Sequence, residues 1–144
     1  MQSMSENDSM MDENLLLDAA REARMKAYAP YSRFLVGAAI LDDQGKLHKG
    51  CNVENVAYPQ GTCAEAGAIA AMILAEGRQI KAIAVVGDSP DPVTPCGGCR
   101  QKIREFAEPT IPILIGDLKQ LRLRQTLADL LPHSFGPEYL LNEP

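Results

Sequence analysis

Hydrophobic and polar positions along the chain form stretches that predict helices and strands in turn. The segment ENLLLDAAREARMKAYA, residues 13–29, carries apolar residues at helical spacing and is stopped by Pro30, so it predicts a helix. The compact apolar run FLVGAAIL, residues 34–41, is followed by the turn sequence DDQG and the polar-apolar segment KLHKGCNVEN. This pattern predicts a β-hairpin over residues 34–52.

Helices and strands continue to alternate in the second half. YPQG, residues 58–61, precedes an apolar helix from Thr62 to about residue 76, with Gly77 as its stop. Strands are predicted at 80–88, 111–116 and 121–125, a loop at 89–95, a short helix at 96–106, and a capping pair of Thr126 with Asp129. The order predicts an α/β fold, a three-layer α/β/α sandwich around a mixed sheet of about five strands.

Composition favours a single globular domain. We expect residues 13–144 to form it, after a polar, acidic and disordered tail over residues 1–12. The net charge of −5 argues against a nucleic-acid polymer as partner. No apolar run approaches the about 20 residues that cross a bilayer, and the first residues lack the basic and apolar regions of a secretory signal. We therefore expect a cytoplasmic protein without a membrane partner.

Four cysteines are present, Cys51, Cys63, Cys96 and Cys99. In a reducing compartment such clustering favours metal or redox chemistry over disulfides. The segment PCGGCRQ can point two sulfurs at one ion, and its glycines let backbone amides approach them. Three interpretations follow: a thioredoxin-like redox pair, a closed structural zinc site that needs Cys51, or a catalytic zinc with three cysteine ligands and one open position.

Glu65 bears on the choice. Thr62 and Glu65 fit a capping box, which would make Glu65 a structural residue. That interpretation leaves the pairing of Cys63 with the later cysteines unexplained. Cys-x-Glu followed by Pro-Cys-x-x-Cys matches the pattern of zinc deaminases, in which the glutamate carries protons beside the open position. The combination favours a catalytic site with one zinc ion per chain.

Four segments carry a resemblance to a known family: YSRFLVGAA, GCNVENVAYPQGTCAE, PCGGCRQ and LLPHSFGPEYL. Over residues 28–140 the chain resembles the small, homotetrameric cytidine deaminases. The resemblance implies hydrolytic deamination of cytidine and deoxycytidine to uridine and deoxyuridine, with release of ammonia, in pyrimidine salvage. It also implies a small nucleoside as substrate and a homotetramer as the assembly.

The resemblance further implies a role for each matched residue. The zinc ligands would be Cys63, Cys96 and Cys99, and Glu65 would be the proton shuttle. Asn52 and Glu54 would hold the ribose hydroxyls, Phe34 would form a wall of the pyrimidine pocket, and Ala64 would offer a backbone contact to the base. Tyr58 and Phe135 would reach the site from neighbouring subunits. Without the family context, these polar residues would be strand ends or turns and the two phenylalanines would be core.

The sequence departs from the family at Ala66, where many relatives have an arginine that partly neutralises the thiolates. We predict that Arg100 instead donates a hydrogen bond to a ligand thiolate. Cys51 is expected to be a packed thiol, and His48 and His133 to be solvated. Two alternative functions stay open: a deaminase of another aminopyrimidine nucleoside, and a structural zinc module that binds a partner without catalysis.

Overall fold

The structure, a computed structural model, describes residues 6–141. None of the helices in this range combines the length and the apolar character that crossing a membrane requires. The elements are α1 (Glu6–Arg24), β1 (Val36–Asp42), β2 (Leu47–Cys51), the 3-10 helix η1 (Tyr58–Gln60), α2 (Ala64–Leu74), β3 (Ile80–Gly87), α3 (Gly97–Glu105), β4 (Pro112–Gly116), β5 (Leu121–Thr126), α4 (Leu127–Leu130) and α5 (Glu138–Leu141).

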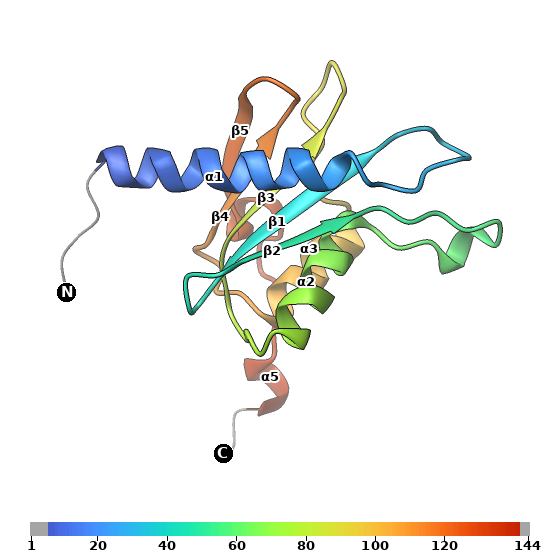
Figure 1. Cartoon of the computed structure of the whole chain (residues 1–144). Helices are drawn as coiled ribbons and strands as arrows, with labels where there is room; N and C mark the ends of the chain where they lie inside the picture. The colour runs from blue at the N-terminus through green and yellow to red at the C-terminus, as the bar shows by residue number, and fades with distance from the viewer. Residues whose placement is uncertain (1–5, 142–144) are drawn as a thin grey trace.

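The five strands form one mixed sheet in the order β2-β1-β3-β4-β5. β3 and β4 are parallel, and the other neighbouring pairs are antiparallel. Helix α1 lies across one face of the sheet, and α2 and α3 lie on the other (Figure 1). The predicted α/β/α sandwich on five strands is confirmed.

Each face of the sheet has its own apolar core because strand residues alternate between the two sides. On the α1 side, Leu16, Leu17 and Ala20 pack against residues such as Leu114. On the α2 and α3 side the core is larger, with Met72 and Ile103 among its helical members. The predicted strands at residues 34–41, 80–88, 111–116 and 121–125 are each confirmed to within a few residues.

The direction of the strands brings the starts of α2 and α3 together. β2 and β3 both run antiparallel to β1, so their carboxyl ends lie at the same edge of the sheet. Helix α2 follows β2 in the chain and α3 follows β3. A Cβ atom on Gly50 would lie 2.3 Å from the Ala64 carbonyl oxygen, so only glycine lets β2 approach the first turn of α2 this closely. The fold thus fixes two helix N-termini beside each other.

Helix α1 differs from its predicted bounds at both ends. It begins at Glu6, earlier than predicted, because residues 6–12 contain no proline or glycine that would stop a helix. The expected tail over residues 1–12 therefore overlaps the helix at residues 6–12. Residues 1–5 lie outside the described part. It ends at Arg24 rather than near Ala29. Tyr28 is instead extended, since its N–H donates to the Asn52 carbonyl oxygen at 2.9 Å and its own carbonyl oxygen accepts from Glu54 N–H.

Helix α2 is not capped as the sequence suggests. Its N-cap is Cys63, without a side-chain capping bond, so the predicted cap at Thr62 and the capping-box role of Glu65 are wrong. At the other end Glu76 has a φ of 70°. The Gly77 N–H donates to the Met72 carbonyl oxygen at 2.9 Å. This bond closes a Schellman motif, with the left-handed residue one position before the glycine.

A buried polar pair lies in the β1–β2 hairpin. His48 was expected to be solvated, but it lies in β2, is buried, and its Nε2 lies 2.7 Å from Oδ2 of Asp42. The other carboxylate oxygen accepts hydrogen bonds from the amides of Gln44 and Lys46. Burial alone would raise the pKa of Asp42, but these hydrogen bonds together hold it below its usual value. The turn is therefore organised around an ionised carboxylate.

Replacing Asp42 with asparagine should lower stability in a pH-dependent way. The folded-state pKa lies below the unfolded value of about 4, so the contribution of the carboxylate is present above that pH and is lost as pH falls through the folded pKa. At neutral pH we expect Asp42→Asn to lower the free energy of unfolding by about 1–2 kcal/mol. Below about pH 4 the variant should lose less further stability than the wild type.

Urea unfolding at neutral and acidic pH measures both effects. Asp88→Asn, which changes an exposed carboxylate at the end of β3, is the matched control and should leave the curves in place. Equal stability of Asp42→Asn and the wild type at neutral pH contradicts the assigned role of the pair.

Candidate functional site

Three cysteines meet where α2 and α3 begin. The sulfurs of Cys63, Cys96 and Cys99 all lie within 4.8 Å of one another. Cys63 is the N-cap of α2 and Cys96 is the N-cap of α3, and Cys99 follows in the first turn of α3. Cys99 is buried, Cys63 is half-buried and Cys96 is exposed. One side of the cluster is therefore closed by the protein, and the other side is accessible.

The electrostatics of the cluster fit a divalent cation. Burial raises the pKa of the Cys99 thiol, and the charges of Glu65 and Cys63 raise it further. Burial also raises the pKa of Cys63. By contrast, the Cys99 amide lowers the pKa of Cys96, as expected for a sulfur at a helix N-terminus. Three thiolates this close repel one another unless a cation lies among them, and three cysteine sulfurs are a common zinc ligand set.

Glu65 lies beside this cluster in the first turn of α2. It is 4% exposed, although an ionised carboxylate is costly to bury without partners. Burial raises its pKa above the ordinary value, and hydrogen bonds from its own backbone amide and from Cys99 oppose the shift, as does the smaller effect of the Lys102 charge. A raised pKa makes a carboxyl group a better proton acceptor than an exposed one, as a group that transfers protons requires.

A cavity of about 610 Å³ opens in front of the cluster. This volume lies within the range of about 300–1,000 Å³ that is typical of small-molecule sites. Of the residues predicted to act, the cavity is lined by Asn52, Glu54, Tyr58, Cys63, Ala64, Glu65 and Cys96. The structure thus places two of the three clustered cysteines and the predicted ribose-binding pair around one space.

Asn52 joins two segments at the wall of this cavity. Its Oδ1 accepts a hydrogen bond from the Val36 N–H at 2.8 Å, and its Nδ2 donates to the Phe34 carbonyl oxygen at 2.8 Å. These bonds hold the start of β1. An amide group has two donor hydrogens and two acceptor lone pairs, so one of each remains for another partner.

Glu54 is held by the segment that precedes β1. Its Oε1 accepts from the amides of Tyr31 and Ser32 at 2.9 and 3.1 Å, and its Oε2 accepts from the Ser32 hydroxyl. The hydrogen bond from Ser32 lowers the pKa of Glu54 below its ordinary value. The carboxylate is therefore ionised at neutral pH and accepts hydrogen bonds from hydroxyl groups.

Phe34 was expected to form a wall of the pocket and Phe135 to reach the pocket of a neighbouring chain. Neither lines the cavity that the described residues of one chain form. The neighbours of Phe34 line it instead, at Ser32 and Val36. Phe135 lies near the carboxyl end of the chain and is 55% exposed. Tyr58 does line the cavity, and its ring packs edge-on against that of Tyr31 with centroids 6.2 Å apart.

Several lining residues were missed from the sequence, chiefly Val53, Val85, Val93 and Thr94. Val85 lies in a strand predicted to be core, and Val93 and Thr94 lie in the loop before Cys96. For Val93 and Thr94, the position just before Cys96 is the one sequence signal that predicts a place at the site. Ser32 belongs to the quoted motif YSRFLVGAA, but the motif by itself gave it no role.

The predicted hydrogen bond from Arg100 to a ligand thiolate is wrong. Its Nε donates to the Pro95 carbonyl oxygen at 2.6 Å, Nη1 to that of Leu130 at 2.8 Å, and Nη2 to the Thr94 hydroxyl at 3.3 Å. Arg100 therefore fixes the loop that leads into Cys96. The lowered pKa of Cys96 arises first from the Cys99 backbone amide. Amides at the start of α3 therefore offset part of the negative charge of the thiolates, which many relatives offset with an arginine at the position of Ala66.

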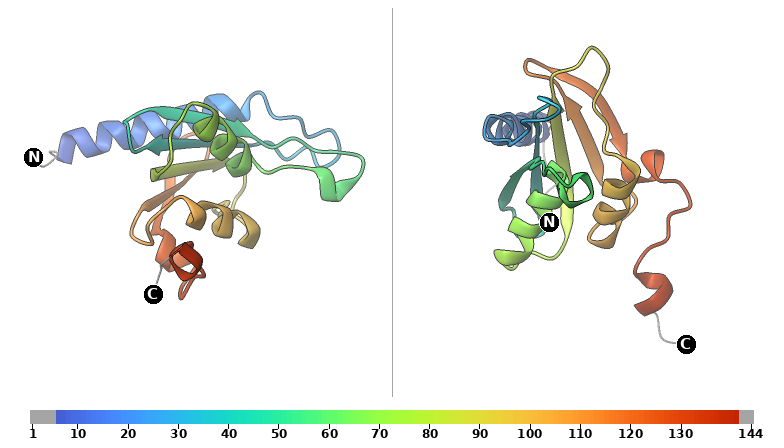
Figure 2. Two further views of the ribbon diagram at one scale, coloured as in Figure 1. Left: turned by 90° about the horizontal axis from the view of Figure 1, so that it is seen from below. Right: turned by 90° about the vertical axis from the view of Figure 1, so that its right-hand side faces the viewer.

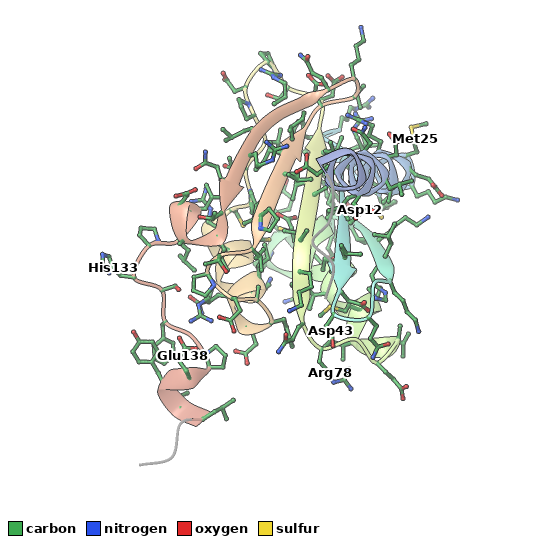
Figure 3. The ribbon with its side chains drawn as sticks, turned by 90° about the vertical axis from the view of Figure 1, so that its left-hand side faces the viewer. Asp12, Met25, Asp43, Arg78, His133 and Glu138 are labelled. Atoms are coloured by element: carbon green, nitrogen blue, oxygen red, sulfur yellow. The ribbon has the colours of Figure 1, made fainter. Side chains whose placement is uncertain are left out.

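Cys51 decides between an open and a closed metal site. It is a half-buried free cysteine in β2, as expected for a packed thiol, and among the described residues it is not part of the metal-binding group. The four-cysteine structural site therefore lacks its fourth ligand. His133 is exposed at the other end of the chain, as predicted (Figure 3).

A three-cysteine metal site with a buried glutamate beside it, at the starts of two helices on a mixed sheet, defines a zinc-dependent deaminase. Residues 10–115 match the family described as the cytidine and deoxycytidylate deaminase zinc-binding region. The chain belongs to this family.

Relatives from bacteria show how far the similarity extends. The cytidine deaminase of Sporosarcina psychrophila is 44% identical over 130 residues, which cover 90% of this chain and 96% of that protein. The crystal structure of cytidine deaminase from Burkholderia pseudomallei is similar with a TM-score of 0.79 at 43% identity, covering 85% of this chain and 98% of that one. The structure from Mycobacterium tuberculosis gives 0.77 at 40% identity, over 87% and 98% of the two chains.

These comparisons confirm the predicted family, fold and zinc cofactor. The individual roles assigned to the other site residues stay predictions: Glu65, Asn52, Glu54, Phe34, Ala64, Tyr58 and Phe135.

Substitution of single cysteines separates the three ligands from the spare thiol. Cys51→Ser should keep about one zinc ion per chain and most of the activity, because its sulfur lies outside the cluster. Cys99→Ser should lose the metal, because a buried hydroxyl is a poor substitute for a thiolate ligand. Atomic absorption on purified variants gives the zinc content, and loss of zinc in Cys51→Ser would contradict the three-ligand site.

Proposed function

We propose that the protein hydrolyses cytidine and deoxycytidine to uridine and deoxyuridine with release of ammonia, and that Glu65 moves the protons. The observation that supports this most is the buried carboxyl of Glu65 beside three clustered sulfurs, on the wall of a nucleoside-sized cavity. The relatives are cytidine deaminases by name, and the chain spans nearly their full length.

Cys63, Cys96 and Cys99 would hold the zinc ion. When bound, zinc supplies Lewis acidity that lowers the pKa of a water molecule to about 7. Glu65 accepts a proton from the attacking water and delivers it to the ring nitrogen of the pyrimidine, which makes the amino-bearing carbon more electrophilic. After attack, Glu65 takes the proton of the hydroxyl group newly bound to that carbon and gives it to the amino group, so the carbonyl of the product forms as the carbon–nitrogen bond breaks and ammonia leaves. A single carboxyl group thus acts as base and then as acid.

The sugar end of the cavity suits a nucleoside. The ionised Glu54 accepts hydrogen bonds from ribose hydroxyls, and Asn52 has one donor and one acceptor free beyond its two backbone bonds. Because both side chains are already fixed by the backbone of residues 31–36, they lose little conformational freedom on binding. Ala64 is fully buried at the start of α2, where its backbone can contact the base.

Two features support an oligomer in which neighbouring chains complete the site. The segments 25–35 and 52–62 extend from one end of the sheet and expose large apolar side chains, among them Tyr28, Tyr31 and Val56 (Figures 1 and 2). Phe135 is exposed and lies outside the cavity of its own chain. In the proposed homotetramer, Phe135 of an adjacent chain closes the pyrimidine pocket, whereas Tyr58 already lines the cavity of its own chain.

An ultraviolet assay of cytidine loss on the purified protein tests the activity. Activity should disappear on treatment with a zinc chelator and return when zinc is added. The matched substrates are deoxycytidine and free cytosine, since cytosine lacks the sugar that Asn52 and Glu54 would bind. Turnover of cytosine at the same efficiency as cytidine would favour a deaminase of other aminopyrimidines, and no turnover of the zinc-loaded protein would favour a structural zinc module.

Glu65→Gln should separate proton transfer from metal binding. The amide keeps the size of the side chain but cannot carry the proton, so turnover should fall by at least about 100-fold while the zinc content stays the same. Steady-state kinetics and metal analysis on one preparation measure both quantities. Turnover close to that of the wild type would show that Glu65 has a structural role only.

Mixed oligomers test whether Phe135 acts on a neighbouring chain. Phe135→Ala should raise KM about tenfold, as expected for the loss of an aromatic contact to the base. Co-expression with Glu65→Gln chains, which are inactive but keep Phe135, should restore a KM near the wild-type value at some of the sites. Co-expression with Glu65→Gln/Phe135→Ala chains is the control and should restore nothing. Equal KM values in both mixtures would show that Phe135 does not act in trans.

A further inference from the structure

The carboxyl-terminal part of the described chain, residues 132–141, forms an arm that projects from the body of the protein (Figure 2). Helix α3 holds it by its side chains. Gln101 Nε2 donates to the Phe135 carbonyl oxygen at 2.8 Å, and Arg104 Nε donates to the Ser134 hydroxyl at 2.9 Å. Arg104 also forms an ion pair with Glu138 of the arm. The same helix carries Cys96 and Cys99 at its start.

Arg104 is the centre of this attachment. Its side chain is 7% exposed overall, although a guanidinium group is costly to bury unless its donors are satisfied. Besides Ser134 and Glu138, it donates to the Ala107 carbonyl oxygen at 3.3 Å. Each of its three nitrogens thus has a partner, and two of the three partners belong to the arm.

The arm is shaped to pass beneath this side chain. A Cβ atom on Gly136 would lie 2.3 Å from Nη2 of Arg104 and 2.6 Å from Oε2 of Glu138, so a side chain at this position would displace the ion pair. Gly136 lies directly after Phe135. The position of the Phe135 backbone is therefore set from both sides, by Gln101 at its carbonyl group and by Arg104 at Ser134 and Gly136.

The apolar side chains of the arm face away from the body. Phe135, Tyr139, Leu140 and Leu141 are all more than half exposed. The rings of Phe135 and Tyr139 pack on each other with centroids 5.2 Å apart. A polar attachment centred on the buried Arg104 thus holds the backbone, while the aromatic side chains are left free for another surface. Figure 3 shows Glu138 on this arm, below the body of the protein.

We propose that Arg104 is a positioning residue for catalysis, which fixes the arm so that Phe135 enters the pocket of a neighbouring chain. This inference rests on the proposed function, because it needs Phe135 to act in trans. Arg104 does not touch the substrate. Its effect passes through the arm, so loss of Arg104 should weaken substrate binding at sites that depend on Phe135 and should leave the metal in place.

A double-mutant cycle tests the proposal in the full-length, zinc-loaded protein. Arg104→Met removes the donors and keeps the apolar stem, and we expect KM for cytidine to rise about tenfold while kcat falls less than about threefold. Phe135→Ala should raise KM by a similar factor. The double variant should be no worse than Phe135→Ala alone, because both changes remove the same contact. Additive effects on KM would overturn the proposal.

Arg124→Met is the matched control, since Arg124 pairs with Glu13 on α1, away from the arm, and the variant should keep the wild-type KM. If Arg104→Met does not fold, the double variant Ser134→Ala/Glu138→Gln replaces it in the cycle. This variant weakens the attachment from the arm side, and we expect the same rise in KM. A wild-type KM in that variant overturns the role of Arg104.

The outcomes also separate this inference from the proposed function. An inactive wild-type protein contradicts the deaminase activity itself. An active protein in which Phe135→Ala keeps its KM contradicts the trans role of Phe135, and with it the role of Arg104. A raised KM in Phe135→Ala with an unchanged KM in Arg104→Met contradicts the role of Arg104 alone.

Discussion

The rest of the structure depends on the close approach of three sulfurs at the starts of α2 and α3. Burial and mutual repulsion disfavour ionisation of Cys63 and Cys99, so the arrangement gains its full stability only with a cation among the three. The approach is possible because β2 and β3 end at the same edge of the sheet and each is followed by a helix. Sheet topology, rather than a local loop motif, therefore creates the metal site.

The residues proposed to bind the ribose also have a structural role in the wall of the cavity. Asn52 and Glu54 each bind the backbone of residues 31–36 through bonds that exist without any ligand. Further pairing of Val53 with Tyr28 and Thr62 ties the two extended segments together. Both side chains are thus held in place by the chain itself, so in the proposed ribose-binding role they would lose little conformational freedom.

Much of this arrangement could be predicted from the sequence, and the exceptions have a common cause. Apolar runs such as residues 34–41 and 80–88 predict their strands, because a strand that is buried on both faces needs apolar residues at nearly every position. The spacing of Cys96 and Cys99 predicts a turn that binds a metal ion. Arg100 and His48 were assigned wrongly, because the partners of a polar side chain depend on tertiary contacts. Arg100 bonds Leu130, 30 positions away. The cap of α2 was misplaced by one residue because the metal ligand Cys63, not the better capping residue Thr62, takes that position.

Helix α3 meets three different demands with only nine residues. Its first turn contains Cys99, and the backbone amides of this turn point toward Cys96. Ile103 fills the core beneath the helix. Three further side chains bind segments from the carboxyl-terminal part of the chain: Arg100, Gln101 and Arg104. Because these groups lie on different sides of one short rigid rod, a shift of the helix moves all of them together. Such rigidity keeps the cysteine cluster at a fixed distance from the segments that these side chains bind. It also explains why the arginines of α3 bind backbone and arm rather than the thiolates: the charge at the metal is moderated by the amides of the helix start, which leaves these side chains to hold the surrounding segments in place.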